Sequence, residues 1–127
     1  MRQATIIGLV LAFSFHRADA AEARSIQLEP LELTPATLTM TGDIRGRRSD
    51  RFAITITTGR RCPASYRRAI RAKLVFAHGR LGRRRMHFVG EAERRSLGSD
   101  EGRVCYLVEN RARTQRRRKH QDFRFGP

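Results

Sequence analysis

The sequence predicts a mostly β domain, a small antiparallel sandwich or barrel held by one disulfide. Three observations support this prediction: apolar and polar residues alternate in several short segments, glycine-rich and charged loops separate those segments, and the only two cysteines enclose the middle of the chain. Alternation is typical of half-buried strands, and many short strands joined by such loops favour antiparallel sheets. The alternative is an α+β domain with a short helix at residues 64–77.

The chain begins with the pattern of an export signal. Arg2 precedes an apolar run over residues 4–15, and Ala18 and Ala20 are the small residues that a signal peptidase requires. The run is shorter than the roughly 20 residues that a membrane-spanning helix needs. We therefore predict a cleaved signal peptide at residues 1–20 and an exported protein, periplasmic or secreted, with no transmembrane segment in the mature chain. An uncleaved membrane anchor is the alternative.

Export would place Cys62 and Cys105 in an oxidising compartment, so we predict a disulfide between them. Closing the loop between residues 62 and 105 would stabilise the fold by about 4 kcal/mol on the chain-entropy estimate. The pairing would also make both thiols unavailable as nucleophiles or metal ligands.

A compact β domain is predicted over residues 21–110. Residues 25–41 alternate, and Pro30 and Pro35 should break them into short strands. A loop should follow at 42–51, and the clearest strand of the chain at 52–58.

Residues 70–92 fit an antiparallel hairpin better than a helix. If Phe76 pairs with Met86 around a turn at 79–83, Leu74 faces Phe88 and one continuous apolar side results. A short helical turn fits at 64–68, ahead of the hairpin.

The last predicted strand, 103–109, carries Cys105, and residues 111–127 form a basic C-terminal tail. The tail is weakly periodic and is predicted to be flexible unless bound. Alternatively, Phe123 and Phe125 complete the sheet as a docked strand.

The charge balance is the strongest functional signal. The chain has 27 basic and 12 acidic residues, a net charge of +15, which attracts polymers of phosphate, carboxylate or sulfate. A compositional bias toward arginine explains Arg in place of Lys, but it does not explain the shortage of acids. Guanidinium groups bind such anions bidentately. The candidate polyanion-binding residues are Arg45, Arg47, Arg48, Arg83, Arg84, Arg85, Arg116, Arg117, Arg118 and Lys119.

Catalysis is not predicted, and neither is a metal or a cofactor. His78 and His87 fall on opposite faces of the predicted hairpin, so they would not converge as acid and base. No two His or Cys have the spacing of a structural zinc site. Ser65, Ser96 and Ser99 lack the context of a nucleophile elbow.

The sequence therefore predicts an exported cationic protein that binds an anionic envelope or extracellular polymer, such as lipopolysaccharide, acidic polysaccharide or nucleic acid. The alternative is a periplasmic interaction subunit whose basic surface meets an acidic protein partner. A small secreted hydrolase or nuclease ranks third.

Overall fold

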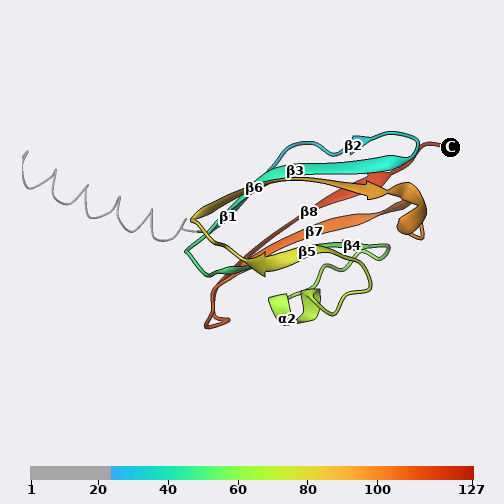
Figure 1. Cartoon of the computed structure of the whole chain (residues 1–127). Coiled ribbons are helices and arrows are strands. Elements are labelled where there is room, and N and C mark those ends of the chain that lie inside the picture. Colours follow the sequence, from blue (N-terminus) through green and yellow to red (C-terminus); the bar gives the residue numbers. More distant parts are fainter. Residues whose placement is uncertain (1–23) are drawn as a thin grey trace, which may run out of the picture.

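Residues 24–127 are described by a computed structural model, and they form two antiparallel sheets packed face to face (Figure 1). The predicted mostly β fold is confirmed as a sandwich rather than a closed barrel. The predicted signal peptide, residues 1–20, lies outside the described residues.

The first sheet is built around β3 (Thr37–Arg45). Strands β1 (Ser25–Leu28) and β2 (Glu32–Leu33) pair with the two halves of one edge of β3, and β6 (Arg85–Glu93) pairs with the other edge. β3 continues through residues 42–45, where a loop was predicted. Gly42 fits here because a Cβ at this position would lie 2.5 Å from the carbonyl oxygen of Gln27. This glycine therefore allows β1 to approach β3 closely rather than forming a turn.

The second sheet has the order β5 (Val75–Arg80), β4 (Arg51–Thr57), β7 (Glu101–Glu109) and β8 (Arg116–Arg124). β4 and β7 match the strands predicted at 52–58 and 103–109 to within two residues at either end.

The predicted hairpin is wrong, because β5 and β6 belong to different sheets. The connection between them carries Leu81, which is only 2% exposed and belongs to the core. In a hairpin, Leu81 would lie at a solvent-facing turn. Burying it between the sheets requires the chain to cross from one sheet to the other at this point.

The C-terminal tail is a strand. β8 pairs with β7 along its whole length, and the side chains of Phe123 and Phe125 are buried in the core. Burial raises the pKa of the Tyr106 hydroxyl, which donates a 2.7 Å hydrogen bond to Oε1 of Gln121 on β8. The docked-strand alternative therefore describes residues 116–124, and the flexible tail does not.

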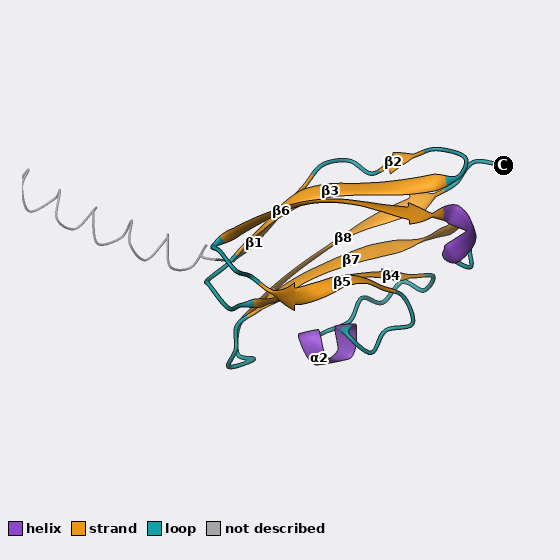
Figure 2. Ribbon diagram, viewed as in Figure 1, coloured by secondary structure: helices purple, strands orange, loops and turns teal. Residues whose placement is uncertain are grey.

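A short helix, α2 (Tyr66–Ala69), covers part of the outer face of the second sheet (Figure 2). The side chain of Ser65 caps its N-terminus, and Ala69 is buried against the sheet. The predicted Cys62–Cys105 disulfide is present and ties this covering segment to β7. The helix is confined to four residues, and the only other helical turn within residues 24–127 is the 3₁₀ turn η1 (Arg94–Ser96), so the α+β alternative does not hold.

The core lies between the two sheets. Its largest fully buried side chains include Tyr106, Ile26, Leu38, Met40, Ile44 and Ile54. Within residues 24–127, no helix is long and apolar enough to cross a membrane.

Candidate functional site

The strand directions bring three basic segments to one end of the sandwich. β3 ends where β6 begins, with Arg45 opposite Arg85, and β4 begins where β5 ends, with Arg51 opposite Arg80. Arg116 at the start of β8 lies beside the same end of the second sheet. Segments 45–51, 80–85 and 110–117, together with Arg24, therefore form one surface, which we call the basic end. Its cations are Arg24, Arg45, Arg47, Arg48, Arg51, Arg80, Arg83, Arg84, Arg85, Arg111, Arg113, Arg116 and Arg117.

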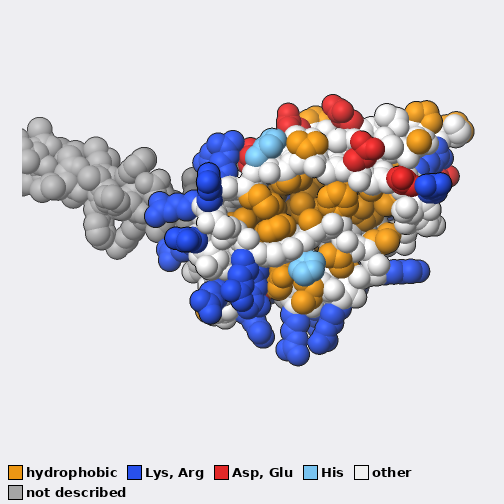
Figure 3. All heavy atoms as spheres, in the orientation of Figure 1, with side chains coloured by type: hydrophobic (Ala, Val, Ile, Leu, Met, Phe, Trp, Pro, Cys, Tyr) orange, Lys and Arg blue, Asp and Glu red, His pale blue; other side chains and the backbone are white. Residues whose placement is uncertain are grey.

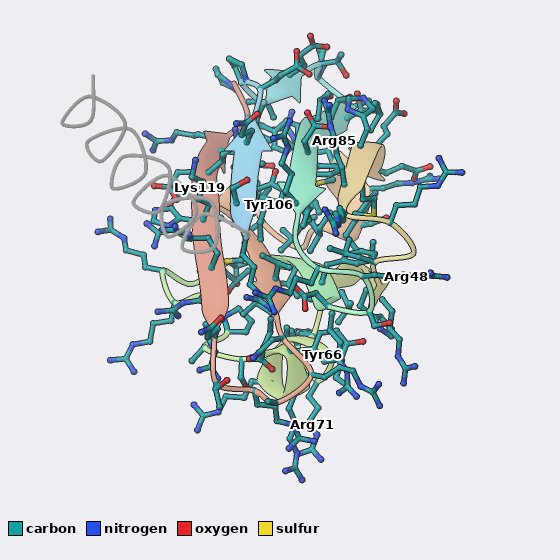
Figure 4. The ribbon with its side chains drawn as sticks, turned by 90° about the vertical axis from the view of Figure 1, so that its left-hand side faces the viewer. Arg48, Tyr66, Arg71, Arg85, Tyr106 and Lys119 are labelled. Atoms are coloured by element: carbon teal, nitrogen blue, oxygen red, sulfur yellow. A yellow bond between two sulfur atoms is a disulfide. The ribbon has the colours of Figure 1, made fainter. Side chains whose placement is uncertain are left out.

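Figure 4 looks at the basic end from the left of Figure 1. Arg48 and Arg85 lie on one side of this view, and Lys119 of β8, which lies just beyond the basic end, is on the other. Cations from both sheets contribute to the basic end, with Arg85 on β6 and Arg116 on β8.

Backbone hydrogen bonds hold two of the basic loops together. The Ser49 amide donates to the carbonyl of Leu81 at 2.9 Å, and the Leu81 amide donates to the carbonyl of Asp50 at 2.7 Å. The Gly46 amide donates to the carbonyl of Arg84 at 2.9 Å. Loops 46–50 and 81–84 are therefore a single hydrogen-bonded unit, which fixes the backbone positions from which their arginines extend.

Asp50 connects this unit to the third basic segment. Its carboxylate is 3% exposed and accepts a hydrogen bond from the Arg47 amide at 2.8 Å. The buried guanidinium of Arg24 lies 2.8 Å from Asp50 Oδ2 and donates to Oε1 of Gln115, also at 2.8 Å. The Arg24–Asp50 ion pair thus joins all three segments beneath the exposed cations.

The acidic side chains are placed unevenly. Those at the basic end within the described residues are Asp43, Asp50 and Glu109, and each is paired with an arginine. Hydrogen bonds from Arg85, and secondarily from His87, hold the pKa of Asp43 below its ordinary value. Toward the opposite end lie Glu32, Glu91, Glu93, Asp100, Glu101 and Asp122.

This placement gives the molecule one strongly cationic end. Figure 3 shows Lys and Arg side chains gathered at the left-hand end and along the lower side, and Asp and Glu mainly at the top and right. Because the acids of the basic end are already paired with arginine, the remaining arginines there are free to attract external anions.

A cationic row extends from the basic end along the outer face of β8. Arg116, Arg118 and His120 alternate along the strand, so they repeat about every 7 Å. Together with Arg103 and Cys62 they line a hollow of about 380 Å³ beside the disulfide. Hydrogen bonds from Arg103 lower the pKa of Asp122, so this carboxylate stays ionised and fixes β8 to β7.

Eight of the ten predicted polyanion-binding residues lie at the basic end: Arg45, Arg47, Arg48, Arg83, Arg84, Arg85, Arg116 and Arg117. Arg118 and Lys119 continue from it along β8, opposite Leu107 and Tyr106. The prediction did not include Arg24. No sequence pattern could have identified it, because its importance depends on being buried against Asp50, 26 residues away.

The three histidines of residues 24–127 lie on three separate strands. His78 on β5 contacts the Tyr66 hydroxyl at 3.1 Å, His87 on β6 contacts Asp43 at 3.1 Å, and His120 lies on β8. In the part of the chain that the structure describes, no group of three His, Cys, Asp or Glu side chains could hold a metal ion. A hollow of about 820 Å³ lies at the opposite end and is lined by both acids and arginines.

The fold has known structural neighbours. Crystal structures of OgpA from Akkermansia muciniphila match this chain with a TM-score of 0.51 and 15% identity; one is the wild-type protein and another a catalytically inactive form in complex with an O-glycopeptide substrate, glycodrosocin. The match covers 80% of this chain but only 27% to 29% of OgpA, and at this identity it shows similarity of fold alone. No protein-family model matches the sequence, and no curated protein matches it.

Proposed function

We propose that this protein is exported and binds an anionic polymer through the basic end. The observation that carries the proposal is the convergence of three separate arginine-rich segments on one surface whose own acids are already paired. The Cys62–Cys105 disulfide supports export, because such bonds persist in oxidising compartments.

Binding would be driven mainly by electrostatics. Arg47, Arg48, Arg83 and Arg84 are exposed, so an anion can contact them without any rearrangement of the fold. A polymer that is neutralised at several positions releases its condensed counterions, which makes the affinity depend steeply on salt. Guanidinium groups add bidentate hydrogen bonds to phosphate, sulfate or carboxylate oxygens.

The hydrogen-bonded loops supply preorganisation. Because loops 46–50 and 81–84 are already bonded to each other, little backbone entropy is lost when a polymer binds. The exposed side chains of these loops are mostly arginines, which bind several kinds of anion. We therefore expect recognition of charge density rather than of one repeating unit. Lipopolysaccharide, acidic polysaccharide and nucleic acid all meet that requirement.

The proposal is tested with a variant that removes four exposed arginines: Arg47→Ser, Arg48→Ser, Arg83→Ser and Arg84→Ser. Affinity for a heparin oligosaccharide, for lipopolysaccharide and for duplex DNA is measured across a range of salt concentrations. On duplex DNA, the slope of log K against log salt should shrink by about 0.9 for each phosphate that the variant no longer neutralises. Affinity for all three polymers should fall together.

The matched control removes four exposed cations from the opposite half of the sandwich: Arg60→Ser, Lys73→Ser, Arg95→Ser and Arg124→Ser. The control variant changes the net charge by the same amount as the basic-end variant. If binding depends on the basic end, the control variant should bind almost as tightly as the unmodified protein. Equal losses in both variants would mean that net charge alone governs binding. Absence of binding to all three polymers at physiological salt would reject the proposal.

A further inference from the structure

Strand β6 has an unpaired edge. Within residues 24–127 it pairs with β3 alone, over all nine residues from Arg85 to Glu93. Such an edge presents free N–H and C=O groups that can accept a further strand. The other long edge strand, β8, carries consecutive cations from Arg116 to Lys119, and like charges there oppose strand addition. β6 carries both signs of charge, so its edge is open to a partner.

The side chains of β6 are complementary to those of a second β6 running in the opposite direction. With Val89 at the centre of such a pair, Arg85 of one copy faces Glu93 of the other, and His87 faces Glu91. The same pairs recur on the other side of the centre because a two-fold interface is self-complementary. Opposite charges directly across an antiparallel pair are stabilising.

The other face of β6 is complementary in size. In the same register Met86 faces Ala92, and Phe88 faces Gly90. Each large side chain thus lies beside a small one, and no two large side chains are directly opposite each other. Moving the register by two residues would place Phe88 opposite its own copy and His87 opposite Val89. The arrangement centred on Val89 is therefore favoured by both faces of the strand.

Apolar side chains are exposed where this pairing would form. Val89 is 66% exposed at the centre of β6, and Phe76 on β5 is 37% exposed. The ring of Phe76 covers Gly90, since a Cβ at Gly90 would lie 2.4 Å from it. Figure 3 shows hydrophobic side chains exposed along the gap between β6 and β5. A partner at this edge would bury them.

We propose that two copies of this chain associate through antiparallel pairing of β6 with β6, forming one continuous sheet across the dimer. The pairing places the basic end of each copy, beside Arg85, next to the partner's more acidic end, beside Glu93. This arrangement reduces the repulsion between two strongly cationic chains. It also points the two basic ends in opposite directions.

A charge exchange across the strand pair tests the proposal. The purified protein, with its disulfide formed, is examined by sedimentation equilibrium, and a concentration-dependent dimer is expected. Arg85→Glu should place Glu opposite Glu, and Glu93→Arg should place Arg opposite Arg, so each variant alone should dimerise with a dissociation constant raised by about tenfold or more. An equimolar mixture of the two variants should recover dimerisation, because both pairs between residues 85 and 93 of opposite copies are again complementary.

A second variant tests the centre of the interface. Val89→Glu sets two carboxylates against each other at the two-fold axis and should abolish the dimer. The substitution also lowers the net positive charge, which reduces the general repulsion between the two chains, so a loss of the dimer would come from the interface itself. Leu33→Glu, an equally polar change at an exposed apolar residue of β2, should leave the dimer intact. Circular dichroism confirms that each variant is folded. A monomeric parent protein at high micromolar concentration, a Val89→Glu variant that still dimerises, or a mixture that stays monomeric would overturn the proposal.

Discussion

At the scale of single residues, the Arg24–Asp50 pair determines the geometry of the basic end. A buried ion pair contributes little net stability by itself, but removal of one partner leaves the other charge buried without compensation. Both side chains are almost fully buried, and Asp50 also accepts a hydrogen bond from the Arg47 backbone. The exposed arginines thus depend on a buried pair that itself contacts no ligand.

Asp50→Ala should therefore lower the free energy of unfolding by about 3–5 kcal/mol. Urea unfolding followed by circular dichroism measures this loss. The control is Asp100→Ala, which removes the partner of Arg94 at an exposed site, and there the loss should be about 0–1 kcal/mol. Similar losses for the two variants would show that the Arg24–Asp50 pair does not organise the three segments.

At the scale of elements, β8 makes the C-terminal residues part of the fold. Its cations remain exposed, while Phe123 is buried between the sheets. The amide of Phe125 donates to the carbonyl of Asp100 at 2.7 Å, which fixes the chain beyond the end of the strand. The same segment therefore contributes both to the core and to the cationic row.

Phe123→Ala should cost about 3–5 kcal/mol of stability through the cavity it leaves. Thermal and urea unfolding report the loss. Phe76→Ala is the same substitution at a partly exposed position, and at protein concentrations too low for dimerisation it should cost clearly less. A mild effect of Phe123→Ala would favour the flexible tail that the sequence suggested.

The strands whose inward residues are apolar were predictable from the sequence. β4, with Ile54 and Ile56 facing the core, and β7, with Val104 and Tyr106, match the predicted ranges closely. The sequence did not show whether β8 is a strand or part of a flexible tail, because Arg117, Lys119 and Gln121 share the inward side with Phe123. The Arg117 and Gln121 side chains meet the backbone carbonyls of Arg24 and Glu29 instead of the core.

The pairing of β5 and β6 could not be read from local pattern. Both strands have apolar residues in alternation, and their faces fit each other in a hairpin as well as they fit separate sheets. Burial of Leu81 distinguishes the two arrangements, and a leucine among glycines and arginines was the available sequence signal. The disulfide was predictable because the chain offers one cysteine pair and its first 20 residues have the pattern that predicts export.

At the scale of the whole molecule, the basic segments that the sequence presents as separate clusters become one surface. Sequence identified most of the arginines of the basic end but not their convergence, because convergence depends on which strands share an end. Antiparallel pairing of β3 with β6, β4 with β5 and β7 with β8 brings them together. The resulting asymmetry of charge should orient an approaching polyanion before contact.

The most direct test of the proposed site is a residue-level map of where a polyanion binds. Backbone amide chemical shifts of the isotope-labelled protein are recorded during titration with a heparin oligosaccharide. The largest changes should fall on residues 45–51, 80–85 and 110–118, with much smaller changes on 29–37 and 93–101. Changes concentrated on the latter segments, or spread evenly over the surface, would contradict the assignment of binding to the basic end.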